Sequence, residues 1–126
     1  MSSGFLLLNA RERVSYFNAR AVRLLGIDSH ELIEQPIFDV RKQLLTLAAE
    51  PENAEGELNR AWYAPEQETS TDMALVSAAV RWLRVRCFPM WDAAGHLLGR
   101  GVLLDDITLE RSSVEARSET LGTGYA

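Results

Sequence analysis

The segment at residues 82–88, Trp-Leu-Arg-Val-Arg-Cys-Phe, constrains the fold more than any other feature, because apolar and charged side chains alternate along it. A period of two is that of a β-strand, so Leu83, Val85 and Cys87 share one face and the two intervening arginines share the other. A slip of one residue would bury both guanidinium groups, which fixes the register. The chain therefore needs a sheet with one face covered by apolar side chains from elsewhere.

Strand-like composition recurs along the chain and predicts a five-stranded sheet. The strands are expected at residues 5–8, 14–17, 71–78, 80–90 and 97–107. The first two are separated by a turn-like segment and form a hairpin. The last three form an antiparallel meander, because short turns join them and residues 92–95 have the sequence of a type I turn followed by glycine.

Between the hairpin and the meander, the apolar pattern changes to the period of a helix. Asn18 is an N-cap and Gly26 a left-handed C-terminal stop for a short helix at residues 19–25. Asp28 and Glu31 have the spacing of a capping box and start one or two further turns. Longer helices are expected at residues 37–48 and 52–63, and a polar helix at 109–121 that frays at 122–124.

Residues 14–26, Val-Ser-Tyr-Phe-Asn-Ala-Arg-Ala-Val-Arg-Leu-Leu-Gly, resemble the I-x-Y-x-N-x-A-x-x-x-L-x-G signature of PAS domains. Further features follow in the order typical of that family: Arg81-Trp82, Pro89, the turn at 92–95 and Asp106-Ile107-Thr108. The resemblance implies an α+β fold, with a PAS-like five-stranded antiparallel sheet in the order 2-1-5-4-3 and short helices on one face. Residues 1–108 would be the sensory domain, and residues 109–126 the start of a linker or signalling helix with a frayed end.

The resemblance also implies a function. In the PAS family the triplet matching Asp106-Ile107-Thr108 marks the exit into a helix that transmits signals to an output domain, such as a histidine kinase, a cyclic-dinucleotide enzyme or a phosphatase. We therefore expect a sensory or dimerisation module of a bacterial-type signalling protein. One position departs from the family pattern, because Glu34 stands where glycine is usual, and this predicts a differently shaped backbone after the second short helix.

The composition disfavours several partners and settings. With 13 basic and 18 acidic residues among 126, the chain has a net charge of −5, which disfavours nucleic acid and anionic membranes as partners. The apolar run at residues 5–8 is far too short to span a membrane, and no basic residue precedes it as in a signal peptide. The single cysteine, Cys87, cannot close an intrachain disulfide, which favours a reducing, cytoplasmic location.

The sequence suggests no catalytic or metal-binding residues and predicts a protein that is not an enzyme. His30-Glu31 begins a near match to the zinc-protease motif H-E-x-x-H, but the second histidine is missing. Asp105 and Asp106 point to opposite faces of a strand and cannot share a substrate. PAS relatives that react with flavin use a cysteine of the helical cluster, and haem-binding relatives use a histidine of the long helix. Residues 18–64 contain no cysteine and residues 37–50 no histidine, so we predict no cofactor.

A ligand pocket is expected between the long helix and the fourth strand. Its lining would be Ile37, Val40, Leu44 and Leu47 from the helix and Leu83, Val85 and Cys87 from the strand. A PAS-type sensor would bind a small apolar or mixed ligand there, although ordinary core packing explains the same residues. Two alternatives stay open: a ligand-free dimerisation module, and a small α+β isomerase or hydrolase, which would need a buried acid-base group.

The outer face of the sheet is expected to form a homodimer, because the apolar run at residues 5–8 needs cover on both faces and the helices cover only one. The expected interface residues are Phe5, Leu7, Trp82 and Phe88, with Val102 and Leu104 extending the patch. Arg81, Arg84, Arg86 and Arg100 are interpreted as a solvated or partner-facing surface. The seven-residue spacing of Ile107, Val114 and Leu121 favours a paired exit helix over one folded back on the sheet.

Overall fold

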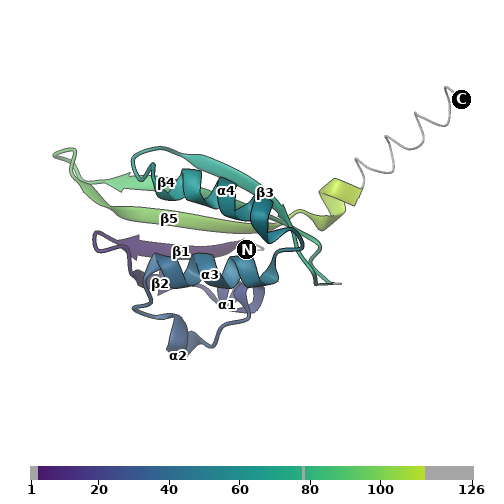
Figure 1. Ribbon diagram of the computed structural model, residues 1–126. Helices are drawn as coiled ribbons and strands as arrows, with labels where there is room; N and C mark the ends of the chain where they lie inside the picture. Colours follow the sequence, from purple (N-terminus) through teal and green to yellow (C-terminus); the bar gives the residue numbers. More distant parts are fainter. Residues whose placement is uncertain (1–2, 78, 113–126) are drawn as a thin grey trace, which may run out of the picture.

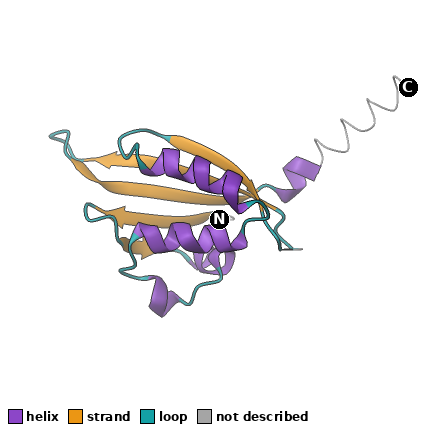
Figure 2. Cartoon of the chain, in the orientation of Figure 1, coloured by secondary structure: helices purple, strands orange, loops and turns teal. Residues whose placement is uncertain are grey.

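The computed structural model describes residues 3–77 and 79–112, which form nine helices and strands (Figures 1 and 2). In chain order these are β1 (Gly4–Asn9), β2 (Val14–Phe17), α1 (Ala19–Leu25), α2 (Ser29–Leu32), α3 (Ile37–Leu47), α4 (Pro51–Trp62), β3 (Thr69–Ala74), β4 (Trp82–Trp91) and β5 (Leu97–Asp106). The order of elements agrees with the prediction from sequence. The α+β class follows from it.

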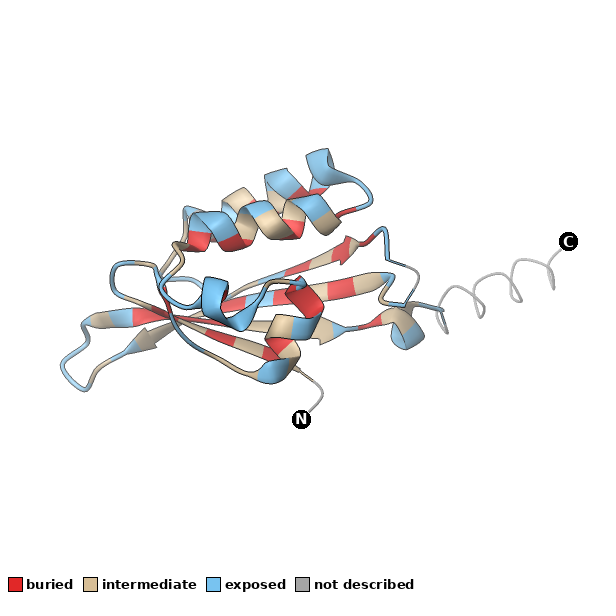
Figure 3. Cartoon of the chain, turned by 90° about the horizontal axis from the view of Figure 1, so that it is seen from below, coloured by how far each residue is buried: buried red, intermediate tan, exposed pale blue. Residues whose placement is uncertain are grey.

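The five strands form one antiparallel sheet in the order β2-β1-β5-β4-β3, which confirms the predicted topology. The helices lie on one face of this sheet, as Figure 1 shows from the helical side. In Figure 3 the molecule is turned, and buried segments of the helices and strands face one another across the space between the two layers. The core therefore lies between the helices and the inner face of the sheet.

The inner face of the sheet carries the residues that the strand alternation predicts. Leu83, Val85 and Cys87 are buried, with 0%, 3% and 8% of their surface exposed. Leu6 of β1 lies opposite Val102 of β5 and is buried with it. The helices contribute Leu25, Leu32, Val40 and Leu44 to the same core.

The prediction that Val102 and Leu104 extend the outer apolar patch is wrong. Both are buried in the core, because Val102 pairs with Cys87 and Leu104 with Val85, and these β4 residues face the helices. Leu103 lies between them in the chain and points to the outer face instead. The outer patch is therefore shifted by one residue along β5.

Asn18 shows how a single cap joins the hairpin to the first helix. Its side-chain oxygen accepts hydrogen bonds from the backbone N–H of Ala21, at 3.0 Å, and of Phe5, at 3.0 Å. Its amide nitrogen donates to the carbonyl of Ser3, also at 3.0 Å. At the other end of α1, Gly26 has φ +68° and its N–H bonds the carbonyl of Val22. Both predicted helix boundaries are thereby explained.

Strand β3 ends earlier than the sequence suggests, at Ala74 rather than at residue 78. Beyond it the backbone changes partners: the N–H of Leu75 bonds the carbonyl of Arg81, and the N–H of Val76 bonds that of Leu47. Because α3 ends beside this segment, its free carbonyls compete with the sheet for the same N–H groups. Helical structure resumes after β5 at residues 108–112, while Val114 and Leu121 of the predicted repeat lie outside the described residues.

Glu34 occupies a left-handed turn, with φ +69°, between α2 and α3. Its N–H donates to the carbonyl of Val14 at 2.8 Å, and its own carbonyl accepts from Nη1 of Arg13 at 3.1 Å. These bonds tie the turn to β2 and hold a conformation that a side chain disfavours. The residue thus adopts the backbone shape that glycine favours, at a cost in strain.

We expect the substitution Glu34→Gly to raise the free energy of unfolding by about 0.5–1 kcal/mol, measured by urea denaturation. Relief of the left-handed strain contributes about 1–2 kcal/mol, and the greater freedom of glycine in the unfolded chain offsets about 0.4–1 kcal/mol of it. Glu34→Ala is the control, because it removes the same side chain and keeps the strain. Equal stability of the two variants would contradict the account.

Candidate ligand-binding site

An internal pocket of about 30 Å³ lies between α3, α4 and the inner face of β4 and β5. Its lining residues are Ile37, Val40, Arg41 and Leu44 from α3, Leu58 and Ala61 from α4, Val85 and Cys87 from β4, and Arg100 and Val102 from β5. The wall is mostly apolar, and its charged members are two arginines. A space of this size holds about two water molecules.

Five of the seven residues that the sequence suggested for a pocket line it: Ile37, Val40, Leu44, Val85 and Cys87. The other two do not. Leu83 is buried near the other end of the pairing between β3 and β4, opposite Met73. Leu47 ends α3 and packs against the edge of the core.

Arg100 is the member of the pocket that the sequence interpretation misplaced. Only 3% of the residue is exposed, so it does not belong to a solvated arginine surface. Its Nη2 lies 2.6 Å from Oε1 of Glu12, on the turn between β1 and β2, and its Nη1 donates to the carbonyl of Ala61 in α4 at 3.1 Å. One guanidinium group thereby links the hairpin, the sheet and α4.

The strand alternation explains where Arg100 points. It lies two residues before Val102 and four before Leu104, so the pleat places all three on the inner face. Arg84 and Arg86 of β4 point to the outer face, where they pair with Asp72 and Asp105. The phase of β5 therefore distinguishes the buried Arg100 from the two arginines of β4.

Cys87 contributes a thiol to the pocket wall. It is a free cysteine, and burial raises the pKa of its thiol, while the positive charge of Arg100 and a contact with Thr69 oppose that shift only in part. A raised pKa keeps the group protonated and unreactive. The thiol thus acts as a small apolar side chain.

We expect Cys87 to react with a disulfide reagent only as fast as the strand opens, because both burial and the raised pKa suppress the thiolate. The rate should rise sharply in denaturant, where the thiol is exposed. A colorimetric thiol assay at pH 8, with and without urea, measures both rates. Rapid labelling of the native protein would contradict the buried position.

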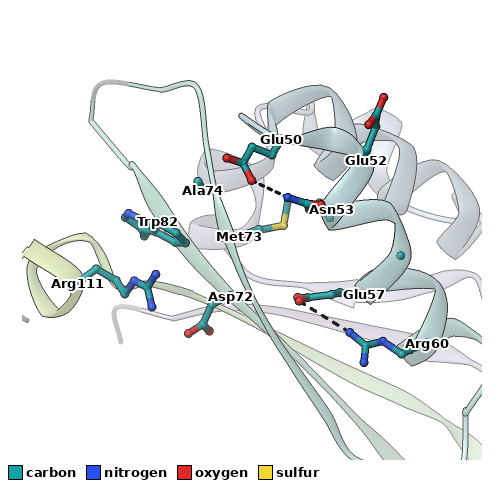
Figure 4. Close-up of a pocket in the computed structure, with 12 residues that line it drawn as sticks. Glu50, Glu52, Asn53, Glu57, Arg60, Asp72, Met73, Ala74, Trp82 and Arg111 are labelled. Carbon is teal, nitrogen blue, oxygen red and sulfur yellow. Dashed lines mark hydrogen bonds and ion pairs between the residues drawn. The ribbon is translucent and has the colours of Figure 1, made fainter. Parts of the chain in front are cut away.

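A larger, open cleft of about 730 Å³ runs along the outside of β3, between α4 and the start of the exit helix (Figure 4). Its lining combines charged and polar side chains with the apolar Met73 and Trp82. An ion pair joins Glu57 to Arg60 at 3.8 Å, and Asn53 donates to Glu50 at 2.7 Å. At the far side the guanidinium carbon of Arg111 lies 3.9 Å from the centre of the Trp82 ring, a cation–π contact.

The exit helix is attached to the sheet at several points. The hydroxyl oxygen of Thr108 accepts from the N–H groups of Arg81 and Trp82, at 3.0 and 3.3 Å. It also donates to Asp106 at 2.6 Å. Glu110 lies 3.8 Å from Arg84. The first turn of this helix is therefore bonded to both β4 and β5.

Three of the four residues predicted for a dimer interface lie close together on the outer face. Phe5 pairs in register with Leu103, Leu7 with Gly101, and Gly101 with Phe88. Phe5, Leu7, Phe88 and Leu103 are only partly covered, and the exposed ring of Tyr16 lies 6.1 Å from that of Phe5. Together Phe5, Leu7, Tyr16, Phe88 and Leu103 form what we call the outer patch.

Trp82, the fourth predicted residue, is separated from the outer patch by charged pairs. Arg84 lies 2.8 Å from Asp72, and Arg86 lies 2.8 Å from Asp105. Partial burial tends to raise the pKa of Asp105, but a hydrogen bond from Ser3 and the charge of Arg86 outweigh it and hold that pKa below its usual value. Trp82 therefore contacts Arg111, whereas the other three predicted residues, Phe5, Leu7 and Phe88, belong to the outer patch.

Within residues 3–77 and 79–112, no group of three or more potential metal ligands from His, Cys, Asp and Glu comes together. Helices long and apolar enough to cross a membrane are likewise not found in that part of the chain. The buried polar and charged residues of the same part of the chain are Thr71 and Arg100.

Comparison with protein families identifies the class. A family model described as the PAS fold matches residues 1–112, which is most of the chain. The chain therefore belongs to the PAS family, whose domains are sensory, generally non-catalytic modules of signalling proteins. A sequence search of the curated proteins finds no match.

Solved structures show the same fold at low sequence identity. The N-terminal domain of a diguanylate cyclase with a PAS/PAC sensor, from Marinobacter aquaeolei, is 18% identical with a TM-score of 0.64, over 86% of this chain and 98% of that one. A domain of a putative light and redox sensing histidine kinase from Haloarcula marismortui is 17% identical, with a TM-score of 0.62 over 84% and 90%. The PAS domain of Bordetella pertussis BvgS is 16% identical, with a TM-score of 0.61 over 98% and 90%.

Proposed function

We propose that this chain is a non-enzymatic, cytoplasmic PAS sensor that binds a small molecule in the internal pocket and passes the event to an output domain. The observation that carries the proposal is the position of Arg100, which contacts both α4 and the turn between β1 and β2 from the pocket wall. We expect a ligand in that space to press on the Arg100 side chain and to weaken one or both contacts. Occupancy of the pocket then changes how the helices and the hairpin rest on the sheet.

The route to the output domain runs along β5. This strand carries Arg100 and ends at Asp106. The side chain of Asp106 accepts a hydrogen bond from the hydroxyl of Thr108 at the start of the exit helix. Because one strand connects the pocket to the exit helix, a shift of β5 at Arg100 would also move the start of that helix. The contact between Arg111 and Trp82 supplies a second point at which the direction of the helix is fixed.

The ligand is tested first on protein purified from cells, by native mass spectrometry and an absorption spectrum. We expect a small added mass without flavin or haem absorption, and loss of that mass in Ala61→Leu, which fills the pocket from α4. Ala54→Leu is the matched control, because it adds the same volume to a buried site of the same helix away from the pocket. Retention of the ligand in Ala61→Leu would contradict the site, and protein without added mass would favour the ligand-free dimerisation module.

We also propose that the outer patch joins two copies of the chain. Its apolar side chains lie on the face of the sheet that the helices leave open, where the register places Phe5, Leu7 and Phe88 on neighbouring strands. A second copy offers the same apolar surface, so the two patches are complementary about a twofold axis. The paired strands would then place two exit helices side by side for a shared output domain.

Analytical ultracentrifugation tests the dimer. We expect a mass near 28 kDa, twice the 14.1 kDa of the chain, at tens of micromolar. Phe88→Glu should give a monomer, because it places a charge in the patch. Leu98→Glu, at an exposed apolar position of β5 outside the patch, should leave the dimer intact. A monomeric parent protein would contradict the proposal.

A further inference from the structure

We propose that the free edge of β3 is a docking site for an extended, basic segment of a partner protein, which adds to the sheet as a sixth strand beside α4. The strand order places β3 at one edge of the sheet and β2 at the other. This inference does not depend on the internal pocket or on the outer patch. It rests on the different ways in which the two edges are covered.

The edge formed by β2 is already closed. The N–H of Val14 donates to the carbonyl of Gln35 at 2.8 Å, and the carbonyl of Val14 accepts the N–H of Glu34 at 2.8 Å. The loop between α2 and α3 thus pairs with the outward side of this strand. A covering loop is one of the ways in which proteins keep an edge strand from pairing with another chain.

The edge formed by β3 is closed only at its end. The carbonyl of Ala74 accepts the N–H of Ala49 at 2.8 Å, on the side away from β4. Because backbone groups alternate between the two sides of an antiparallel strand, those of Ser70 and Asp72 face the same way as those of Ala74. Among the described residues, the backbone N–H and C=O groups of Ser70 and Asp72 have no hydrogen-bond partner.

The sequence of β3 does little to keep another strand away. Natural edge strands often carry lysine, proline or a bulge. Residues 69–73 contain one charged residue, Asp72, and its carboxylate is held by Arg84 at 2.8 Å. The pairing of β3 with β4 runs from Thr69 to Ala74 without a shift in register. The open edge is therefore regular and about as long as an ordinary strand.

Open space adjoins this edge on the side of α4. The cleft of about 730 Å³ lies between β3 and α4, and a second cleft of about 430 Å³ shares Glu57 and Asp72 with it. In Figure 4 the side chains of Glu50 and Glu57 reach from α4 toward β3. The two clefts together provide room for an extended chain along β3. In this mode of recognition the main-chain hydrogen bonds supply affinity and the flanking side chains supply specificity.

The charges around the larger cleft favour a basic partner over a second copy of this chain. Its charged lining residues are four acids and two arginines: Glu50, Glu52, Glu57, Asp72, Arg60 and Arg111. Glu50 accepts from the neutral Asn53, and Glu57 reaches Arg60 only at 3.8 Å. The two arginines that line the second cleft are both paired with aspartates. A lysine of the added strand therefore meets carboxylates, whereas the acidic edge of a second copy would repel them.

The probe is the capped peptide acetyl-Lys-Thr-Val-Thr-Val-Lys-amide, compared by NMR titration of the full chain with the same peptide carrying Glu in place of both Lys. We expect the basic peptide to bind about tenfold more tightly at low salt, by a margin that shrinks as the ionic strength rises. Hydrogen exchange at the amides of Ser70 and Asp72 should slow when this peptide is saturating, because these N–H groups gain partners.

Two pairs of variants test the backbone and the charge separately. Ser70→Pro removes an outward N–H and keeps the bonds to β4, so it should weaken binding about tenfold or more, whereas Ser70→Ala should not change it. Glu57→Gln should weaken binding about threefold. Glu55→Gln, on the side of α4 that pairs with Arg41, should leave it unchanged. Circular dichroism checks that each variant is folded.

A fully N-methylated version of the basic peptide cannot donate hydrogen bonds and should not bind the parent protein. Binding of this peptide as tight as that of the unmodified one would overturn addition to the sheet, even if Ser70→Pro proved unfolded. Equal binding of the Lys and Glu peptides would overturn the basic partner, and failure of the Lys peptide to bind would overturn the docking site. If Ser70→Pro instead converted a dimer to a monomer while Phe88→Glu did not, the edge would belong to a second copy.

Discussion

Leu83→Ala is expected to lower the free energy of unfolding by about 2–5 kcal/mol, the range for removing a buried leucine side chain. Leu83 has 0% exposure on the inner face, near the start of β4, with Met73 on one neighbouring strand and Asp106 on the other. The two neighbouring strands hold the backbone in place, so the space left by the substitution cannot close fully. Urea denaturation followed by circular dichroism measures the loss.

Arg86→Ala is the control on the opposite face of the same strand. Its side chain is 45% exposed and its ion pair with Asp105 lies at the surface, so its removal should cost about 1 kcal/mol or less. The comparison therefore tests which face of β4 each side chain occupies. A loss below about 1 kcal/mol for Leu83→Ala would mean that the inner and outer faces are reversed.

The same alternation explains why much of the fold was predictable. The pattern around Leu83 fixes one strand face, and the local signals of Asn18 and Gly26 fix the ends of α1. These signals act over a few residues, so they can be recognised without knowing the partners in space. Their order along the chain then matches the PAS pattern, and the family and the sheet order are both confirmed.

The pocket was predictable only in part. The helical stripe of Ile37, Val40 and Leu44 faces the sheet as expected, because a period near 3.6 defines the side of α3 that is buried. Leu47 continues the stripe, but it lies at the end of the helix, beyond the residues that line the pocket. A periodic pattern gives the buried side of an element, whereas the position along the element at which a cavity opens depends on the packing of α4.

The contacts of Arg100 were beyond local sequence signals. Glu12 is 88 residues away in the chain, and the carbonyl of Ala61 belongs to a helix that no side-chain pattern connects to β5. The strand around Arg100 also contains two glycines, which carry no side chain to mark a face. Only the three-dimensional pairing of β1 with β5 shows that the guanidinium points inward.

One of those glycines, Gly99, gives the other large expected effect. A Cβ built at Gly99 would lie 1.9 Å from the carbonyl oxygen of Leu8 on the neighbouring strand. The next nearest atoms are the carbonyl carbons of Leu8 and Asn9, at 3.0 and 3.2 Å, so every close neighbour is backbone. Backbone atoms cannot rotate away as a side chain does. Gly99→Ala is therefore expected to force β1 and β5 apart and to cost about 3 kcal/mol or more.

Two other glycines provide matched controls for Gly99→Ala by the same denaturation measurement. At Gly101 the nearest atoms belong to the ring of Phe88, 2.2 Å away, and because a ring can turn, Gly101→Ala should cost less, about 1–2 kcal/mol. At Gly56 in α4 nothing lies within 4 Å, so Gly56→Ala should stabilise the helix by about 0.5–1 kcal/mol. If Gly99→Ala proved as mild as Gly101→Ala, the close approach of Leu8 to β5 would not exist. The inward position of Arg100, which follows from the same register, would then be in doubt.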